Sequence, residues 1–472
     1  MPSLRRLPPL RWTLFFALIA ISLIAAPAIV LRAAGYRFDF PRLRLVETGA
    51  ISVHALPPGA EVRVEATRDL NIPPITKRTS ALSSNLFFPN LLPGEYRIVV
   101  DRAGRAAWQK TATVEEKKTS SFPFVRLFPN APSSLTVTLA RKPQGLAANP
   151  DASAAVGWDH RGIFGANLVK QSTLTALTEI LAGAIQDVNF VSNETLLVHF
   201  ANGALVEVRN ILAQTPAIIP LPGTYQSAIP FGEDRIVGLA QNKTLVLIRV
   251  TATGIALQAF NREAIAIAGA DGWLSFLDPG GILWTMRDDG SDLRQRTVVP
   301  LADLERIRLF SGRNGEVLAV IDSNDTAWFL DEGDDRFSVL ADGIADAVFS
   351  HDNAKLLLVG SHEISLYAVR ERLDQPIRPK GSREIVTRFS EPIKAAAFLP
   401  QEEEYAAVLS SSALHIVELD GRGNRNDVSY PPAPAFALAH DAQRLLVLDA
   451  DSQELTSISI PSPDILERIR SR

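Results

Sequence analysis

The hydrophobic and polar positions divide this chain of 472 residues into three parts with different periodicities. Residues 12–31 are uncharged and almost continuously apolar. Residues 48–129 alternate apolar and polar positions with a period of two, which is typical of strands. Residues 130–462 repeat a unit of about forty residues, and residues 463–472 form a C-terminal tail.

The apolar run predicts a transmembrane signal-anchor helix at residues 12–31, because ~1.5 Å per residue is enough to cross a hydrocarbon core of ~30 Å. Residues 1–11 are expected to be a short cytoplasmic segment, and residues 32–47 a linker. No second run of this kind follows in the sequence, so we expect a single-pass membrane protein. Since long C-terminal domains translocate largely regardless of charge, we expect the folded part to be extracytoplasmic.

A cleaved signal peptide is the alternative interpretation of the same run. Arg5, Arg6 and Arg11 form a basic region before it, and residues 26–28 have the small-x-small pattern of a cleavage site. The apolar stretch continues past that site to Leu31, which is longer than the ~7–15 residues of a usual signal peptide. The length therefore favours an uncleaved anchor.

The period-two part predicts about six short strands. Ile51, Val53 and Ala55 would face one side of a sheet, with Ser52 and His54 on the other. Turn sequences rich in proline and glycine separate the apolar runs. Short strands at this spacing are typical of a small β-sandwich, which has no room for a catalytic cleft.

This part resembles the PEGA domain of bacterial proteins. The resemblance rests on Gly-Ala-Ile-Ser-Val leading to Leu-Pro-Pro-Gly-Ala-Glu-Val within residues 49–62, on Leu-Leu-Pro-Gly-Glu-Tyr at residues 91–96, and on the strand of Trp108. The flanking residues 35–39 and 127–129 extend it to proteins that carry a membrane span, one PEGA domain and a WD40-like propeller. The resemblance implies an Ig-like or transthyretin-like, non-catalytic sandwich associated with cell surfaces.

The sequence departs from the PEGA pattern at three places. Pro58 stands where the motif has its glutamate, Arg105 replaces a usual aromatic residue, and residues 66–84 form a long insertion. These departures concern contacts that would be specific to PEGA domains more than they concern the fold.

The repeated part predicts a β-propeller of seven or eight blades. The clearest copies of the strand-turn-strand unit are residues 187–198, 346–359 and 396–409, and weaker copies bring the total to about eight. Residues 135–139 are a candidate for completing the last blade, so the count stays open between seven and eight. The first strand of each unit is rich in alanine, as expected for inner strands that crowd around a narrow axis.

Composition and motifs exclude several kinds of chemistry. The chain has no cysteine, which excludes disulfides, thiolate metal sites and cysteine nucleophiles. The net charge is −4 with scattered lysine and arginine, so nucleic acid is not an expected partner. The sequence contains no Gly-x-Ser-x-Gly elbow, dinucleotide fingerprint or P-loop. We therefore assign no catalytic, cofactor-binding or metal-binding residue and expect no cofactor.

Two histidines occupy equivalent places in the repeat. His351 and His440 each precede an aspartate in the turn after the first strand of a unit, and we predict that Asp352 and Asp441 cap these turns. Acidic clusters at residues 288–292, 322–325 and 331–335 lack the alternating register of a calcium loop, so they are predicted to be hairpin turns. Calcium at one of them is the alternative.

Two charged segments interrupt the repeat. Residues 369–391 are predicted to be an extended loop, which is either a functional segment or a plain solvated insertion. Residues 402–404, three glutamates, are predicted to be a solvated turn.

We expect a non-enzymatic, membrane-anchored protein of the cell envelope whose sandwich and propeller bind a protein or a cell-wall polymer. The alternative is a propeller hydrolase acting on an envelope polysaccharide, which would require paired carboxylates in the propeller centre. Inward signalling is a third hypothesis, but the residues before the span leave no room for an output domain.

Overall fold

The structure is a computed structural model of the full chain. It describes residues 9–33, 35–39, 44–67, 73–80, 83–174, 183–231, 234–251, 254–401, 403–450 and 452–462. Most of the predicted cytoplasmic segment and the whole predicted tail, residues 463–472, lie outside the described residues.

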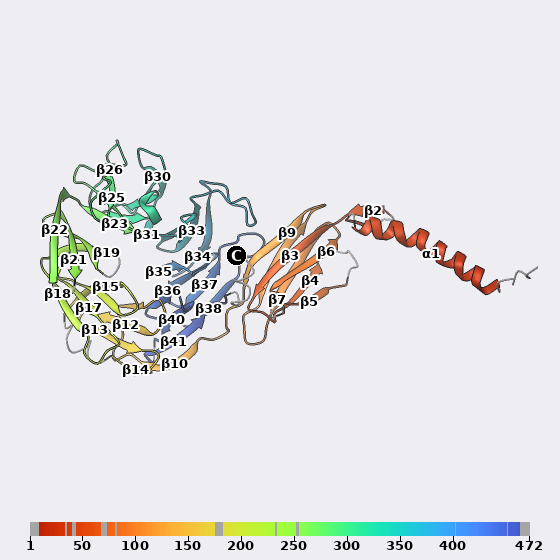
Figure 1. The fold of residues 1–472 in the computed structure, drawn as a ribbon, viewed down its shortest axis with the longest axis horizontal. Helices are drawn as coiled ribbons and strands as arrows, with labels where there is room; N and C mark the ends of the chain where they lie inside the picture. Colours follow the sequence, from red (N-terminus) through yellow and green to blue (C-terminus); the bar gives the residue numbers. More distant parts are fainter. Residues whose placement is uncertain are drawn as a thin grey trace, which may run out of the picture.

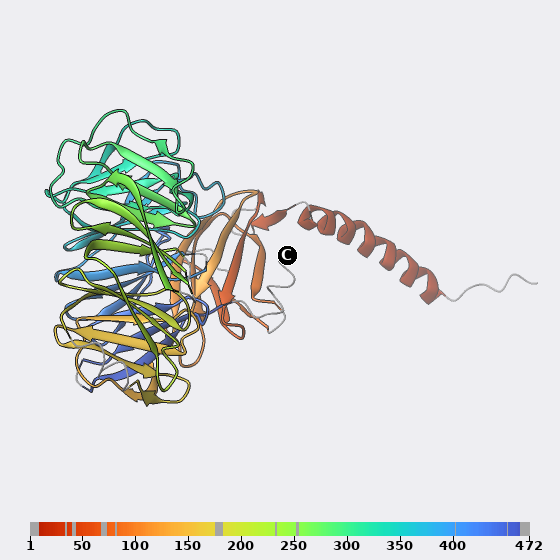
Figure 2. The ribbon, with the colours of Figure 1, turned by 60° about the vertical axis from the view of Figure 1, so that its left-hand side comes forward.

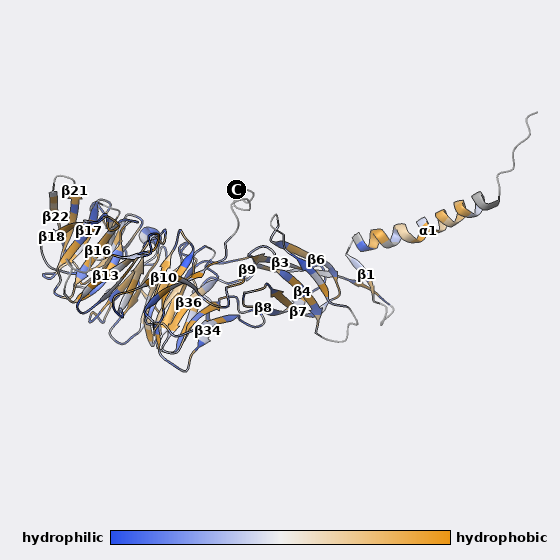
Figure 3. Ribbon diagram, turned by 90° about the horizontal axis from the view of Figure 1, so that it is seen from below, coloured by the Kyte–Doolittle hydropathy of each residue, from blue (hydrophilic) through white to orange (hydrophobic). Residues whose placement is uncertain are grey.

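The predicted apolar helix is confirmed as α1 (Pro9–Ala33). Its stretch Trp12–Arg32 has a mean hydropathy of 2.8, is long enough to cross a membrane, and is not buried against the rest of the protein. Figures 1 and 3 show this hydrophobic helix projecting from one end of the molecule. A hairpin of β1 (Tyr36–Asp39) and β2 (Arg44–Glu47) connects it to the folded part.

The N-terminal β unit is a sandwich of two sheets. One sheet has the order β6-β3-β9 and the other β5-β4-β7-β8. The strands are β3 (Gly49–Leu56), β4 (Glu61–Ala66), β5 (Ile75–Arg78), β6 (Asn85–Leu91), β7 (Gly94–Asp101), β8 (Trp108–Val114) and β9 (Thr119–Arg126). Alternate residues of these strands, such as Ile51, Val62 and Ile98, are fully buried between the sheets.

The sandwich has seven strands where about six were predicted. One strand that was not predicted is β5, which lies within the predicted insertion, residues 66–84, at the edge of its sheet. Three of its four side chains are exposed. An edge strand of this kind has no buried face, so the sequence shows no apolar alternation there.

The remaining strands form eight four-stranded antiparallel sheets, the blades of a β-propeller (Figure 1). From the innermost strand outward, blade 1 is β11 (Gly145–Ala148), β12 (Ala154–Asp159), β13 (Gly162–Asn167) and β14 (Ser172–Thr173), and blade 2 is β15 (Ile185–Phe190), β16 (Thr195–Phe200), β17 (Leu205–Arg209) and β18 (Ala217–Leu221). Blade 3 is β19 (Tyr225–Pro230), β20 (Arg235–Ala240), β21 (Thr244–Thr251) and β22 (Gly254–Glu263), and blade 4 is β23 (Ala266–Ala270), β24 (Trp273–Leu277), β25 (Leu283–Arg287) and β26 (Arg294–Gln295). Blade 5 is β27 (Arg308–Ser311), β28 (Leu318–Ile321), β29 (Ala327–Leu330) and β30 (Ser338–Ala341), and blade 6 is β31 (Ile344–Phe349), β32 (Lys355–Gly360), β33 (Glu363–Ala368) and β34 (Arg383–Arg388). Blade 7 is β35 (Ile393–Phe398), β36 (Tyr405–Ser410), β37 (Leu414–Glu418) and β38 (Asp427–Tyr430), and blade 8 is β39 (Phe436–Ala439), β40 (Arg444–Leu448), β41 (Glu454–Ser459) and β10 (Ser133–Thr138).

Blade 8 closes the ring by combining strands from the two ends of the propeller. Its outer strand, β10, comes before blade 1 in the sequence and pairs antiparallel with β41. Val137 of β10 is buried in an apolar cluster with Leu446 of blade 8 and Phe164 of blade 1. The segment proposed from sequence to complete the last blade, residues 135–139, therefore contributes to it.

Apolar clusters between consecutive blades hold the ring together. Each of eight clusters combines side chains of two neighbouring blades, from blades 1 and 2 around to blades 8 and 1. The alanine-rich strands are the innermost ones, as predicted, and β23 packs beside β27 near the axis. Ala266 and Ala268 of β23 are buried there, where larger side chains would not fit between crowded strands.

Candidate functional site

One face of the propeller carries the sandwich. In an antiparallel four-stranded blade, the turn between the first and second strands and the turn between the third and fourth lie at the same edge of the sheet. We call the face formed by these turns the docking face. The sandwich contacts three of its segments, residues 369–382, 399–404 and 419–426, in blades 6 and 7. Figure 2 shows the sandwich against this face, with α1 directed away from the propeller.

Lys110 of β8 is the centre of the contact between the two domains. Its side chain is completely buried, and its Nζ atom donates a hydrogen bond of 2.7 Å to the backbone oxygen of Asp420. The same ammonium lies 3.2 Å from Glu418 Oε1 and 3.5 Å from Asp420 Oδ2. One residue earlier in β8, the backbone N–H of Gln109 donates to Asn426 Oδ1 at 2.9 Å.

Arg422 extends the contact to β9 of the sandwich. Its guanidinium donates to Ser121 O at 2.9 Å and to Gln375 Oε1 at 2.8 Å, and it lies over the Phe122 ring. Gln375 in turn accepts the backbone N–H of Ser121 at 2.6 Å. Asp420 accepts hydrogen bonds from Arg422. Burial raises the pKa of Asp420, but the bonds from Arg422 and the charge of Lys110 outweigh that effect and bring the pKa below its usual value.

The end of β9 packs into the propeller itself. Phe128 is buried in the apolar cluster between blades 7 and 8, where its ring meets Tyr405 edge-on at 5.2 Å. The Tyr405 hydroxyl accepts the backbone N–H of Arg126, and Arg126 donates to Gln401 Oε1 at 2.9 Å. Buried ion pairs, hydrogen bonds and apolar packing together form the joint between the sandwich and the propeller.

Glu404 corrects a prediction made from the sequence. Residues 402–404 were expected to form a solvated turn, but Glu404 is 2% exposed. It accepts hydrogen bonds from Lys355, Arg372 and Arg378. Burial raises its pKa, but these cations outweigh that effect and bring the pKa below the usual value. A run of charges in a sequence does not show which member folds inward.

The segment of residues 369–391 also differs from its prediction. Its second half contains β34, the outer strand of blade 6, so the loop is confined to residues 369–382. Gln375 of this loop binds the sandwich, and Arg372 lies over the ring of Phe124 on β9. The loop is therefore part of the joint between the domains rather than a plain solvated insertion.

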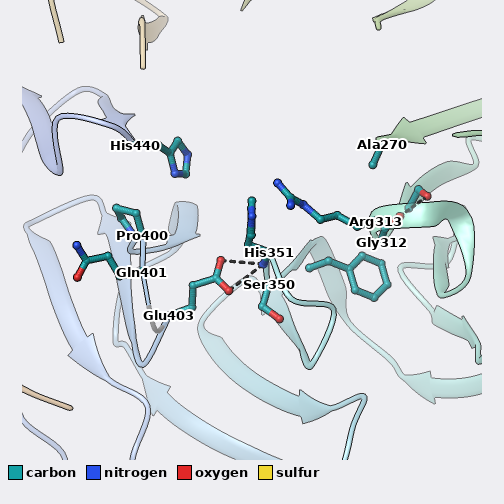
Figure 4. Close-up of a pocket in the computed structure, with 11 residues that line it drawn as sticks. Ala270, Gly312, Arg313, Ser350, His351, Pro400, Gln401, Glu403 and His440 are labelled. Atoms are coloured by element: carbon teal, nitrogen blue, oxygen red, sulfur yellow. Dashed lines mark hydrogen bonds between the residues drawn. The ribbon is translucent and has the colours of Figure 1, made fainter. Parts of the chain in front are cut away.

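A pocket of about 460 Å³ lies on the docking face at the central axis (Figure 4). We call it the axial pocket. The ends of the innermost strands of blades 4 to 8 and the turns that follow them line it, through Ala270, Ser311, Gly312, Arg313, Phe349, Ser350, His351, Pro400, Gln401, Glu403 and His440. It lies beside the sandwich, since Gln401 both lines the pocket and accepts the hydrogen bond from Arg126.

Four ionisable side chains from four blades meet in the axial pocket. Arg313, His351 and His440 extend toward its centre, and Glu403 lies beneath His351 (Figure 4). The backbone N–H of His351 donates to both carboxylate oxygens of Glu403, at 2.9 and 2.8 Å. Lys355 Nζ, behind the pocket, donates to the backbone oxygen of Glu403 at 2.8 Å.

The pocket changes the ionisation of two of these groups. Burial raises the pKa of Glu403 to about 7, although the His351 N–H and the charges of Lys355 and Arg313 oppose the rise. Burial also lowers the pKa of His440, with Asp441 opposing this effect and His351 adding to it. Glu403 therefore changes its charge near neutral pH.

The structure tests the other residues considered from the sequence. Asp352 caps its turn as predicted, since its Oδ1 accepts the N–H of Ala354 at 2.9 Å and the Ser350 hydroxyl at 2.7 Å. Among the acidic clusters, Asp322 accepts the N–H groups of Asn324 and Thr326 across a hairpin turn. Within the described residues, no group of three or more His, Asp and Glu side chains is arranged to hold a metal ion.

The sequence showed the equivalence of His351 and His440 but not the pocket. Both follow the innermost strand of a blade, and so do Arg313 and Gln401 in other repeats. Because these residues occupy the same position in different repeats, the sequence indicates that their side chains lie at the same end of the propeller axis. Which of them meet depends on ring closure and on the width of the axis.

Comparison with known proteins shows a distant likeness in fold. No protein-family model and no curated protein matches the chain. Among solved structures, it is similar to the Dos1 propeller, at 12% identity and a TM-score of 0.49, over 70% of this chain and 94% of that one. The C-terminal WD40 domain of Sif2 matches at 12% identity and a TM-score of 0.48, over 70% of this chain and 99% of that one.

Two further solved structures show a distant likeness of the same kind. Hsv2 of Kluyveromyces lactis matches at 11% identity and a TM-score of 0.43, over 62% of this chain and 99% of that one. The structure of YCF48 bound to D1 peptide matches at 12% identity and a TM-score of 0.40, over 59% of this chain and 92% of that one. The likeness concerns the fold alone, and the sheet order and the inter-blade clusters are what establish the eight blades.

Proposed function

We propose that this chain is a non-enzymatic scaffold of the cell envelope, anchored in the membrane by α1 and binding a protein partner through its propeller. The observation that carries the proposal is the joint around the fully buried Lys110, whose ion pairs favour one orientation of the propeller to the sandwich. The face opposite the docking face is turned away from α1 (Figure 2). The PEGA-like sandwich then acts as a spacer between bilayer and propeller.

The propeller fold supports the binding role, because propellers commonly present binding surfaces on their faces, although fold alone does not define function. The turns between the second and third strands of each blade form the face opposite the docking face. Asn202 and Asn242 are exposed in two such turns. Asn193 is exposed on the docking face and provides a matched comparison.

Photocross-linking in cells of the source organism tests this proposal. A photoreactive amino acid replaces Asn202, Asn242 or Asn193 in the tagged full-length protein, and the products are identified by mass spectrometry. We expect one recurrent protein partner from at least one face of the propeller. Cross-linked products found only on insoluble cell-wall polymer, or no product at any position, would overturn the proposal that the chain is a scaffold for a protein partner.

A polysaccharide hydrolase is the alternative function, and Glu403 is the observation that favours it. A carboxyl group with a pKa near 7 in a pocket is suited to general acid catalysis. Glycosidases use two carboxyl groups, whereas Glu403 is the one carboxylate among the described residues that line the axial pocket. Turnover of an envelope glycan that is lost in Glu403→Gln would replace the scaffold proposal with this one.

A further inference from the structure

The axial pocket contains an array of basic groups that the fold alone does not require. Arg313 is the most firmly placed of them, because Asn353 accepts its backbone N–H at 2.7 Å and donates to its backbone oxygen at 2.8 Å. Its guanidinium extends over the pocket (Figure 4), and its Nε lies 3.4 Å from Asp271 Oδ2. A planar guanidinium has five N–H donors, so most of its donor capacity remains for a ligand.

The imidazoles of His351 and His440 complete the array from blades 6 and 8 (Figure 4). Either ring can donate a hydrogen bond from a protonated nitrogen. An oxyanion is the group that accepts bonds from a guanidinium and imidazole N–H groups together.

The apolar part of the lining indicates what else the occupant carries. Phe349, Pro400 and Ala270 also line the pocket, and its volume of about 460 Å³ is several times that of a carboxylate. An inorganic anion would leave this apolar surface in contact with water. An aspartate or glutamate side chain on a peptide would place its stem and backbone there.

We propose that the axial pocket binds a carboxylate side chain from an acidic segment of a protein partner, with Arg313, His351 and His440 as its contacts. This rests on the proposed scaffold function and specifies the chemistry of the partner. The occupant enters on the docking face beside the sandwich, which borders the pocket through Gln401 and Arg126.

Glu403 makes this binding dependent on pH. The groups that act on its carboxyl are the His351 N–H, Lys355, Asp352 and Arg313. An ionised Glu403 repels an incoming carboxylate, whereas a protonated one donates a hydrogen bond to it. Since its pKa is about 7, affinity rises as the pH falls through neutrality and drops about tenfold for each pH unit above it.

The test uses the full-length protein in nonionic detergent micelles and a rhodamine-labelled peptide of alternating Glu and Gly. Fluorescence anisotropy is measured at about pH 6 and about pH 8, where we expect an affinity difference of about tenfold. Arg313→Gln and His440→Gln are expected to weaken binding at pH 6 about tenfold. Arg249→Gln, an exposed arginine of β21 outside the pocket, is the matched control and leaves binding unchanged.

Several outcomes would overturn the inference. These are no binding at pH 6, equal binding of a peptide with Gln in place of Glu, and equal losses in Arg249→Gln and Arg313→Gln. Binding of inorganic phosphate without binding of the peptide would assign the pocket to free anions instead. If photocross-linking still captures the partner in Arg313→Gln at the wild-type level, the pocket inference is wrong while the scaffold proposal stands.

Discussion

The ammonium of Lys110 in the sandwich lies 3.2 Å from Glu418 Oε1 in the propeller, and both side chains are almost entirely inaccessible to solvent. Removing a charged group from water costs several kcal/mol unless another charge and hydrogen bonds compensate for it. Glu418, Asp420 and the backbone oxygen of Asp420 compensate Lys110 only when the two domains are in contact. The pair therefore favours one arrangement of sandwich and propeller over all others.

Lys110→Met is expected to weaken the joint by about 3–5 kcal/mol, because it leaves the buried Glu418 without its cation and Asp420 with Arg422 alone. Hydrogen–deuterium exchange measures this in peptides containing Gln109 and Ser121, whose N–H groups donate across the joint. Both should exchange faster in the variant. Lys118→Met, which removes a largely exposed lysine paired with Glu115, is the control. Equal exchange in the Lys110 and Lys118 variants would contradict the role of the pair.

Gly423→Ala is expected to disturb the joint through backbone contact. Gly423 has a φ of +62°, and a Cβ added there would lie 2.5 Å from the backbone oxygen of Thr111 in the sandwich. Gly333 also has a positive φ, +83°, but open space around it, so Gly333→Ala has the conformational cost without the clash. We expect Gly423→Ala to lower the free energy of unfolding by about 1–3 kcal/mol more than Gly333→Ala, as measured by urea denaturation. An equal loss of unfolding free energy in the two variants would show that the structure accommodates the added methyl group beside Thr111 without destabilisation.

Glu404→Gln should destabilise the propeller near blades 6 and 7 by about 3 kcal/mol at neutral pH, because three cations lose their buried partner. The pKa of Glu404 is lowered from its usual 4.5, so its contribution is present above that pH and is lost as the pH falls below it. Urea midpoints of wild type and variant should therefore converge in acid. Glu305→Gln, at an exposed position, is the control. An unchanged urea midpoint of Glu404→Gln at neutral pH would contradict the stabilising role of the ion pairs around Glu404.

The contribution of Glu403 to stability depends on pH in the opposite direction to that of Glu404. Its pKa is raised from 4.5 to about 7, so the folded state binds a proton that the unfolded state releases, and stability falls as the pH rises from about 4.5 to about 7. Glu403→Gln should remove this slope, leaving the variant more stable than wild type at about pH 8 and similar to it near pH 4.5. Urea midpoints across this range measure the effect, with Glu332→Gln at an exposed position as the control. Parallel curves for wild type and Glu403→Gln would contradict the raised pKa.

Much of the fold could be predicted because its strands are half buried. Ile51 and Val53 follow the period of two that a sandwich strand requires, and the alanine-rich strands occur on the inside of the ring. The strands β5 and β34 were missed for the opposite reason, because edge and outer strands bury few of their side chains and show little apolar alternation.

The apolar helix, the period-two sandwich and the repeat of a propeller could all be predicted from the sequence, since each depends on spacing between residues close in the chain. The folded structure was needed to show which charges are buried and which side chains meet. Glu404 and its cations, Lys110 with Glu418, and the pair His351 and His440 come from separate strands or domains. Their proximity follows from ring closure and domain docking, which depend on packing across the whole chain and leave no local pattern in the sequence.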